Sequence, residues 1–118
     1  MEFRACHRFA RISPRKARYV IDLVRGKSVN DALRILRATH KRSSCMIDKV
    51  IRAALAAANE NLSVDVDSLH VVRAMADGGP TRKWHRTRAR GMSTSILKRT
   101  SHITIVLSEK TKKVKIKK

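Results

Sequence analysis

The stretch GGPTRKWHRTRARGMSTSILKRTSH, residues 78–102, decides the fold because it separates two strand-like segments without resembling either of them. Its apolar residues are few and scattered, so it cannot bury enough surface to offset the entropy of ordering. Asp77 precedes it and the next carboxylate along the chain belongs to Glu109, so no acid within it balances its charge. Its basic residues are Arg82, Lys83, Arg86, Arg88, Arg90, Lys98 and Arg99.

The flanking segments, residues 69–76 and 102–108, are apolar and favour strands. Hairpin loops in compact domains have about 2–5 residues, and this connection is much longer. Residues 78–99, continued as two arms of about 11 residues each, reach about 35 Å at ~3.3 Å per residue. RARG lies at the centre, where Gly91 tolerates the positive φ of a turn. The sequence therefore predicts a long basic β-hairpin, about residues 78–101, that stands clear of the body.

The composition indicates what orders such a hairpin. The chain of 118 residues has 28 Lys and Arg against 9 Asp and Glu, a formal net charge of +19 at pH 7. A two-stranded ribbon is marginal in water, and like charges along it destabilise it further. Nucleic acid is the commonest polyanion that neutralises such an excess. We therefore expect phosphates to surround the hairpin and to order it.

The rest of the chain supplies a core. Residues 2–10 alternate as in a half-buried strand, with Phe3, Ala5, His7 and Phe9 on one side and Arg4, Cys6 and Arg8 on the other. ISPRKARYVIDLVRG, residues 12–26, predicts a helix with Ser13 as N-cap, Pro14 at the first helical position and Gly26 at the end. Its apolar stripe is Ala17, Val20, Ile21 and Val24.

Two more helices follow. Ser28 with Asp31 predicts a capping-box-like start, after which Val29, Ala32, Leu33 and Leu36 face inward. The third helix is the longest, and its stripe is Ile47, Val50, Ile51, Ala54, Leu55, Ala58 and Leu62. The predicted fold class is α+β: three helices packed on a small three-stranded antiparallel sheet, with the long hairpin protruding. Residues 1–109 form a single domain in this prediction, followed by a Lys-rich tail, residues 110–118.

A second basic patch lies across the first strand and the start of the first helix. Its members are Arg4, Arg8, Arg11, Arg15, Lys16 and Arg18. The helix N-terminus near Ser13 adds backbone N–H donors that suit a phosphate. We expect both this patch and the hairpin cations to bind RNA, with arginine making the closer contacts because its guanidinium is planar and bidentate.

Other chemistries are disfavoured by the residues. The five histidines show no i, i+4 pair, and Cys6 and Cys45 share no metal-ligand or disulfide spacing. No serine lies in a nucleophile-elbow setting, so we expect neither an enzyme nor a metal, cofactor or small-molecule substrate. The segment KKVKIKK, residues 112–118, lacks the apolar face of a membrane-surface helix, and no apolar run is long enough for a membrane span.

Several blocks resemble the family of large-subunit ribosomal protein twenty-two, bacterial type. They are ISPRKARYVIDLVRGKSVNDALRIL, AALAAANEN, GGPTRK, RARG and, most specifically, ILKRTSHITIV. The resemblance runs from His7 to Ser108. Three positions depart from it, because the family commonly has an acidic residue where Gly78 stands, a basic residue where Trp84 stands and proline where Thr87 stands.

The resemblance implies a cytoplasmic, structural constituent of the large ribosomal subunit. It implies binding of large-subunit ribosomal RNA, a role in assembly, contacts with neighbouring ribosomal proteins, and a hairpin that lines the exit tunnel of the nascent polypeptide. The implied tunnel-lining tip is Trp84, Thr87, Arg88, Ala89, Arg90 and Gly91. The residues alone leave one alternative open, a histone-like DNA-binding protein, although such arms typically carry an apolar wedge that is not obvious here.

Overall fold

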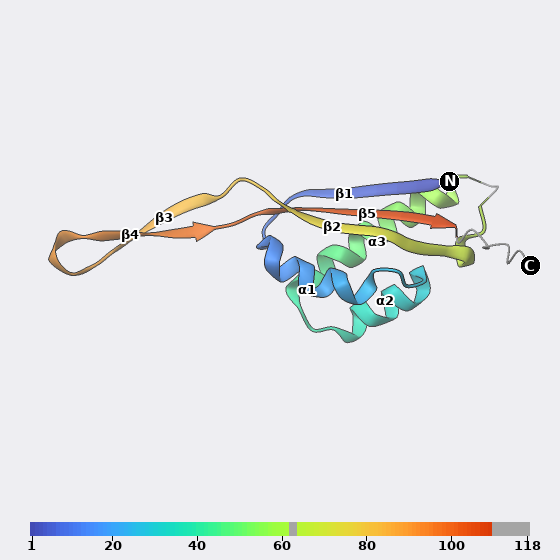
Figure 1. Cartoon of the computed structure of the whole chain (residues 1–118), viewed down its shortest axis with the longest axis horizontal. Coiled ribbons are helices and arrows are strands. Elements are labelled where there is room, and N and C mark those ends of the chain that lie inside the picture. The colour runs from blue at the N-terminus through green and yellow to red at the C-terminus, as the bar shows by residue number, and fades with distance from the viewer. Residues whose placement is uncertain (62–63, 110–118) are drawn as a thin grey trace, which may run out of the picture.

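A computed structural model of the chain describes residues 1–61 and 64–109. The element order is β1 (Glu2–Ala10), α1 (Pro14–Val24), α2 (Val29–Ala38), α3 (Arg42–Asn59), η1 (Val66–Ser68), β2 (Leu69–Gly78), β3 (Arg82–Thr87), η2 (Ala89–Gly91), β4 (Ser93–Lys98) and β5 (Ser101–Glu109), where η is a 3₁₀ turn (Figure 1). Helices and an antiparallel sheet occupy separate parts of the chain, which confirms the α+β class. The predicted tail, residues 110–118, lies outside the described residues.

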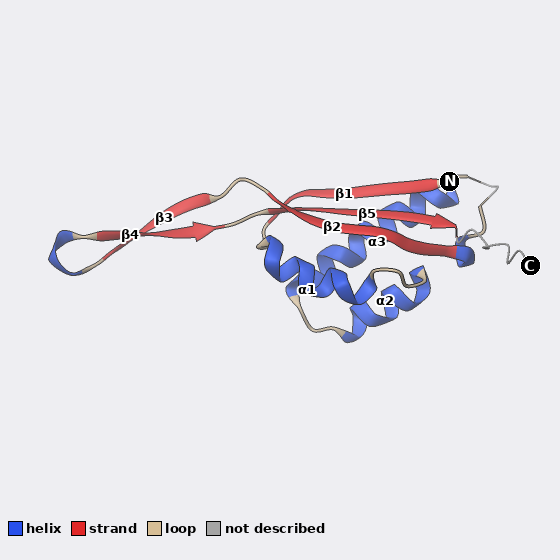
Figure 2. Ribbon diagram, in the orientation of Figure 1, coloured by secondary structure: helices blue, strands red, loops and turns tan. Residues whose placement is uncertain are grey.

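The strand order β1-β5-β2 places β5 at the centre of an antiparallel sheet. The helices cover one face of this sheet (Figure 2). Ile103, Ile105 and Leu107 are fully buried in the core that the helices form with it. Thr104 and Val106, on the opposite face, are buried as well. The side chains of the central strand from Ile103 to Leu107 are therefore buried on both of its faces.

The expected alternation of β1 fails near its end. The register with β5 shifts between His7 and Ala10, and Phe9 has a φ of 57°. Phe9 was predicted to face inward beside Phe3, but its ring is exposed and Ala10 is buried in its place. The prediction for Phe9 is wrong because a β-bulge inserts an extra residue and re-aims the side chains beyond it.

Both ends of α1 are where the sequence predicts them. The Ser13 hydroxyl accepts a hydrogen bond from the backbone N–H of Lys16 at 3.4 Å, and Pro14 opens the helix. Gly26, just beyond the end, has a φ of 75°. The predicted stripe Ala17, Val20, Ile21 and Val24 is buried. Cap, proline and glycine thus fix the length of α1, and its stripe binds it to the core.

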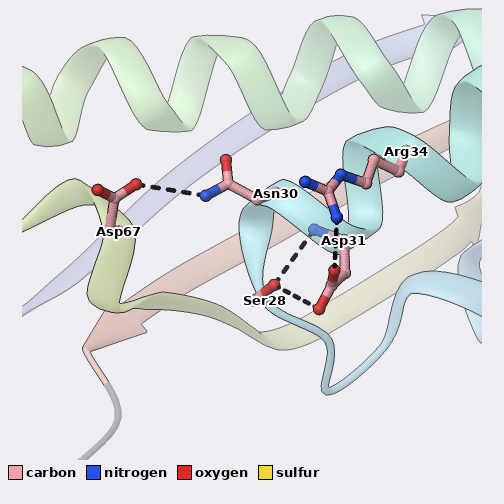
Figure 3. Close-up of polar contacts among 5 residues, drawn as sticks. All are labelled: Ser28, Asn30, Asp31, Arg34 and Asp67. Atoms are coloured by element: carbon pink, nitrogen blue, oxygen red, sulfur yellow. Dashed lines mark hydrogen bonds and ion pairs between the residues drawn. The ribbon is translucent and has the colours of Figure 1, made fainter.

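The start of α2 is held by a small polar cluster (Figure 3). Ser28 accepts from the backbone N–H of Asp31 at 3.2 Å, and its hydroxyl donates to the Asp31 carboxylate at 2.8 Å. Arg34 lies 3.9 Å from the same carboxylate, and Asn30 donates to Asp67 of η1 at 3.3 Å. These contacts confirm the capping-box-like start, and the last of them ties α2 to the segment that precedes β2.

The third helix begins earlier than its apolar stripe indicates. α3 starts at Arg42, and its first turn buries Ser43 and Ser44. It ends at Asn59, and Leu62, the last member of the predicted stripe, lies outside the described residues. The sequence did not reveal the first turn because polar side chains occupy its buried positions. In the described part of the chain, no helix is long and apolar enough to cross a membrane.

The strands β3 and β4 form a separate two-stranded antiparallel sheet. They extend away from the helices, and the longest dimension of the molecule is 74 Å against 35 and 24 Å for the others (Figure 1). Gly78 and Ser101, the ends predicted for the hairpin, still pair with each other in the three-stranded sheet. The separate ladder runs from Arg82, opposite Lys98, to Thr87, opposite Ser93.

Candidate nucleic-acid interface

Every residue of β3 and β4 is exposed. Because neighbouring side chains of a strand alternate between faces, the register defines the two faces of this ribbon. One face carries Arg82, Trp84 and Arg86 with their cross-strand partners Lys98, Ile96 and Thr94. The other carries Lys83, His85 and Thr87 opposite Leu97, Ser95 and Ser93. Charge is thus distributed over both faces, while the larger cations and the indole share the first.

The tip is a tight turn of residues 88–92. The backbone N–H of Arg88 donates to the carbonyl of Met92 at 2.7 Å, and its Nε donates to Thr94 Oγ1 at 3.2 Å. Arg90 and Gly91 have φ values of 60° and 67°. The positive φ predicted for Gly91 is confirmed, and Arg90 adopts the same left-handed region without being a glycine. Trp84 and Thr87, predicted for the tip, belong to β3 rather than to the turn.

The base of the hairpin is fastened by one backbone–backbone hydrogen bond and one from a side chain to the backbone. The N–H of Gly79 donates to the carbonyl of Thr100 at 2.9 Å, and the Thr100 hydroxyl donates to the carbonyl of Pro80 at 2.7 Å. A Cβ on Gly79 would lie 2.5 Å from Thr100 Oγ1 and 3.3 Å from Nε2 of His102. A larger residue at this position would have to displace the Thr100 hydroxyl, which donates to Pro80. The base is therefore the point where the direction of the hairpin is set.

The second predicted patch is divided by the structure. Arg4 and Arg8 are exposed on β1, and Arg11 and Lys16 are exposed around the start of α1. Arg18 is exposed as well, but its Nε donates to the carbonyl of Ala76 in β2 at 3.1 Å. Arg15 donates to the hydroxyl of Tyr19 at 3.3 Å. Arg18 thus ties α1 to the sheet, a role that its position on the helix did not reveal.

All the ion pairs of the described residues lie in the body. They are Asp22 with Arg25, Asp31 with Arg34, Asp48 with Arg52, and Glu2 with Arg73. The hydrogen bond that Arg52 donates to Asp48, together with the negative charge of that carboxylate, raises the pKa of Arg52 above the usual guanidinium value. Over residues 1–61 and 64–109, no basic residue of the hairpin has a carboxylate partner. The acids of the body therefore leave the whole charge of the hairpin uncompensated.

One basic residue of the interface, Arg42, was not predicted from the sequence. Arg42, the first residue of α3, lines a groove together with Arg11 and Lys16 of the body and Arg82 and Lys98 of the hairpin. The segment around residue 42 reads as the polar end of the second helix, so nothing in it pointed to the hairpin. The packing of α3 against β1 and β5 brings Arg42 to the groove. Basic residues from three distant parts of the chain thus meet at one place.

The sequence of the chain is similar to those of known proteins. The sequence model of the family described as "Ribosomal protein L22p/L17e" matches residues 5–108. Three curated proteins, each named "Large ribosomal subunit protein uL22", align over 110 residues, 93% of this chain. The one from Halothermothrix orenii is 53% identical with 97% of it covered, and the one from Pelotomaculum thermopropionicum is 51% identical with 97% covered. The one from Syntrophobacter fumaroxidans is 53% identical with 100% covered. The chain belongs to the ribosomal protein L22p/L17e family.

Proposed function

We propose that the chain is a structural constituent of the large subunit of cytoplasmic ribosomes and binds large-subunit ribosomal RNA. Membership of the family supports the first part, since the relatives carry the name of a large-subunit protein. The formal net charge of +19 supports the second. In this proposal residues 1–109 act as one RNA-binding domain with a protruding hairpin, and the tail of residues 110–118 adds diffuse charge.

The observation that carries the proposal is the fully exposed, uncompensated charge of β3 and β4. A ribbon with one exposed ladder and no core of its own gains order only from its surroundings. Phosphates on both sides would neutralise its cations, and arginine binds them through paired hydrogen bonds. The RNA-binding residues of this proposal are Arg82, Lys83, Arg86, Arg88, Arg90, Lys98 and Arg99 of the hairpin, with Arg4, Arg8, Arg11, Arg15, Lys16 and Arg18 of the body.

The tip has a different part in the proposal. Residues 88–91 form the turn at the far end of the hairpin. In this proposal they extend past the RNA that surrounds β3 and β4. We assign them, with Thr87, to the wall of the nascent-peptide exit tunnel, whereas Trp84, which was expected there too, lies nearer the base of the hairpin in β3. Neighbouring ribosomal proteins and the growing polypeptide are then further partners, and early binding by the body assists assembly. Crosslinks from nascent chains to residues 82–93 test this assignment, and their absence would count against it.

Truncation of the hairpin tests RNA binding. A variant in which residues 82–98 are deleted keeps the Gly79–Thr100 contact, and the hydrophobic core contains none of the deleted residues. We expect its cooperative thermal melting to persist. Binding of large-subunit ribosomal RNA, measured over a range of salt, should lose up to about 4–5 units of log–log slope, since six basic residues are deleted and each phosphate contact contributes about 0.7–0.9.

The control neutralises cations that already have partners. Arg34→Gln with Arg52→Gln removes two exposed, ion-paired guanidinium groups of the body. This variant should change the salt slope by less than about one unit. Equal slopes for the truncated and the intact chain would refute binding through the hairpin. Loss of cooperative melting on truncation would refute the division into a body and a dependent hairpin.

A histone-like DNA-binding protein is the second candidate. One observation favours it: Met92 is an apolar residue at the tip and is 68% exposed, as an intercalating wedge would be. Competition between folded large-subunit ribosomal RNA and random duplex DNA for the labelled protein separates the two candidates. Preference for the RNA at constant salt supports the ribosomal function, and preference for the duplex supports the histone-like one.

A further inference from the structure

A groove of about 980 Å³ lies between the body and the base of the hairpin. Phe9, Lys16 and Arg42 contribute to its body wall, and Trp84 and Lys98 to its hairpin wall. We propose that this groove holds one unpaired nucleotide of the bound RNA, with the base stacked on Trp84 and the phosphate between the cations of the two walls. The proposal rests on the proposed function, since it specifies how the same RNA is held.

The charge of the groove favours an anion that joins its walls. Arg11, Lys16 and Arg42 face it from the body, and the hairpin contributes Arg82, Lys98 and Arg99. All of its lining residues lie in the described part of the chain, and none of them is acidic. None of these cations takes part in an ion pair with the carboxylates of residues 1–61 and 64–109. Like charges on two facing walls repel, so an intervening phosphate stabilises the angle between the hairpin and the body.

Trp84 supplies the stacking surface. Its ring is 63% exposed although it is the largest apolar group of the chain, and it lies on the face of the ribbon that also carries Arg82 and Lys98. The Nζ of Lys98 lies 5.8 Å from the ring centroid, close enough to add a cation–π attraction. An aromatic ring flanked by cations is the usual platform for an unpaired base in single-stranded nucleic acid.

Phe9 provides an independent indication at the opposite wall. A bulky residue with positive φ is an outlier, and such strain persists where the surrounding structure imposes it, often at binding sites. Here the N–H of Phe9 donates to Nδ1 of His102 at 3.0 Å, and the two rings meet edge to face at 4.9 Å. The ring is left 56% exposed. The bulge therefore turns an aromatic side chain out of the core and into the groove.

The pairing of two aromatic rings with cations narrows the class of occupant. The chain has only two Phe, one Tyr and one Trp, and two of these four aromatic residues line this groove. Duplex RNA shows stacked bases that an indole cannot reach, whereas an extruded base is free to stack on it. An acidic peptide of a neighbouring protein would satisfy the cations but would leave the exposed rings unused.

Trp84 is the only tryptophan of the chain, so its fluorescence reports on the groove directly. The full-length protein is titrated with single-stranded oligoadenylate, with an abasic ribose-phosphate strand of equal length, and with duplex RNA of equal charge. We expect strong quenching by oligoadenylate and weak quenching by the other two at equal occupancy. Quenching by the abasic strand as strong as that by oligoadenylate would overturn the proposal. Equally strong quenching by polyglutamate, which has charge but no bases, would overturn it too.

Variants separate stacking from charge and from folding. Trp84→Ala should weaken oligoadenylate binding about 5- to 100-fold, because a stacked base contributes about that much. Trp84→Phe keeps an aromatic face and should retain most of the affinity. Leu23→Ala, at an exposed apolar residue of α1 outside the groove, is the matched control and should bind as the parent does.

The outcomes also distinguish this proposal from the broader one. If Trp84→Ala binds oligoadenylate as tightly as Leu23→Ala, the groove does not stack a base, and the proposal is wrong. Salt-dependent binding of ribosomal RNA by both variants would then leave the proposed function intact. If the parent protein binds no RNA at all, the proposed function itself fails, whatever the fluorescence shows.

Discussion

Two serine hydroxyls show how single residues fix the body of this protein. Ser13 and Ser28 each accept a hydrogen bond from the first turn of the helix that follows. The helix α2 gains more from its cap than α1 does, because the Asp31 carboxylate accepts a hydrogen bond from the Ser28 hydroxyl and also lies near Arg34. A helix without such a cap leaves its first N–H groups to water. In α3 the capping position is Lys41, which makes no side-chain contact of this kind.

Ser28→Ala should lower the free energy of unfolding by about 1 kcal/mol, since the first turn of α2 loses its acceptor. Urea denaturation of the full-length chain measures the change. Ser95→Ala is the control, because Ser95 is exposed on β4 and its loss should change the free energy by less than about 0.5 kcal/mol. Equal effects of the two substitutions would show that the cap of α2 does not contribute to stability.

The sequence predicts the roles of residues that act on their immediate neighbours better than it predicts contacts between distant residues. Ser13, Ser28 and Gly26 were assigned their roles correctly because caps and stops depend on the residue and its immediate neighbours. The roles of Arg18 and Arg42 depend on which distant carbonyl or wall the fold brings near them. Phe9 was assigned to the wrong side of its strand, because a bulge is set by the pairing with β5. Non-local contacts of this kind leave no periodic signal in the sequence.

At the scale of elements, the neighbouring strands β4 and β5 differ in burial: β4 contributes nothing to the hydrophobic core, and β5 is the central strand of the sheet that the core packs against. β4 is exposed at every position, whereas β5 is buried from Ser101 to Leu107 except at His102. Only Arg99 and Thr100 separate them. The hydrophobic core includes Ile103 and Ile105 but no residue of β3 or β4. The stability of the two elements should therefore differ sharply.

Ile105→Ala should destabilise the body by about 2–5 kcal/mol, because it removes a fully buried side chain and leaves a cavity. Ile96→Ala makes the same chemical change on β4, where the side chain is 37% exposed, and should cost less than about 0.5 kcal/mol. Denaturant unfolding followed by circular dichroism compares the two. Similar losses of stability would mean that the hairpin folds as part of the core.

The elements themselves were readable from the sequence to different degrees. The apolar stripes of α1 and α2 predicted helices because both are amphipathic with marked ends. The start of α3 was missed because Ser43 and Ser44 occupy buried positions. The strand β2 alternates poorly because its register with β5 shifts between Val71 and Arg73. Where polar residues are buried or a bulge changes the register, the order of apolar and polar residues no longer indicates which side chains face the core.

The whole molecule combines a packed body with an arm that has no interior. The charge follows the same division, since the ion pairs of the described residues lie in the body and the cations of the hairpin lack carboxylate partners. A polyanion that surrounds the arm therefore stabilises the elongated shape, while the body folds through its own core. The groove at the base is the place where both parts would grip the same RNA.

Amide hydrogen exchange of the intact protein, alone and bound to large-subunit ribosomal RNA, tests this division most directly. In the free protein the amides of β3 and β4 should exchange at least about a hundredfold faster than those of α3 and β5, because opening the arm disrupts no core. Binding of the RNA should slow exchange throughout the arm. Protection of β3 and β4 equal to that of α3 in the absence of RNA would contradict the account.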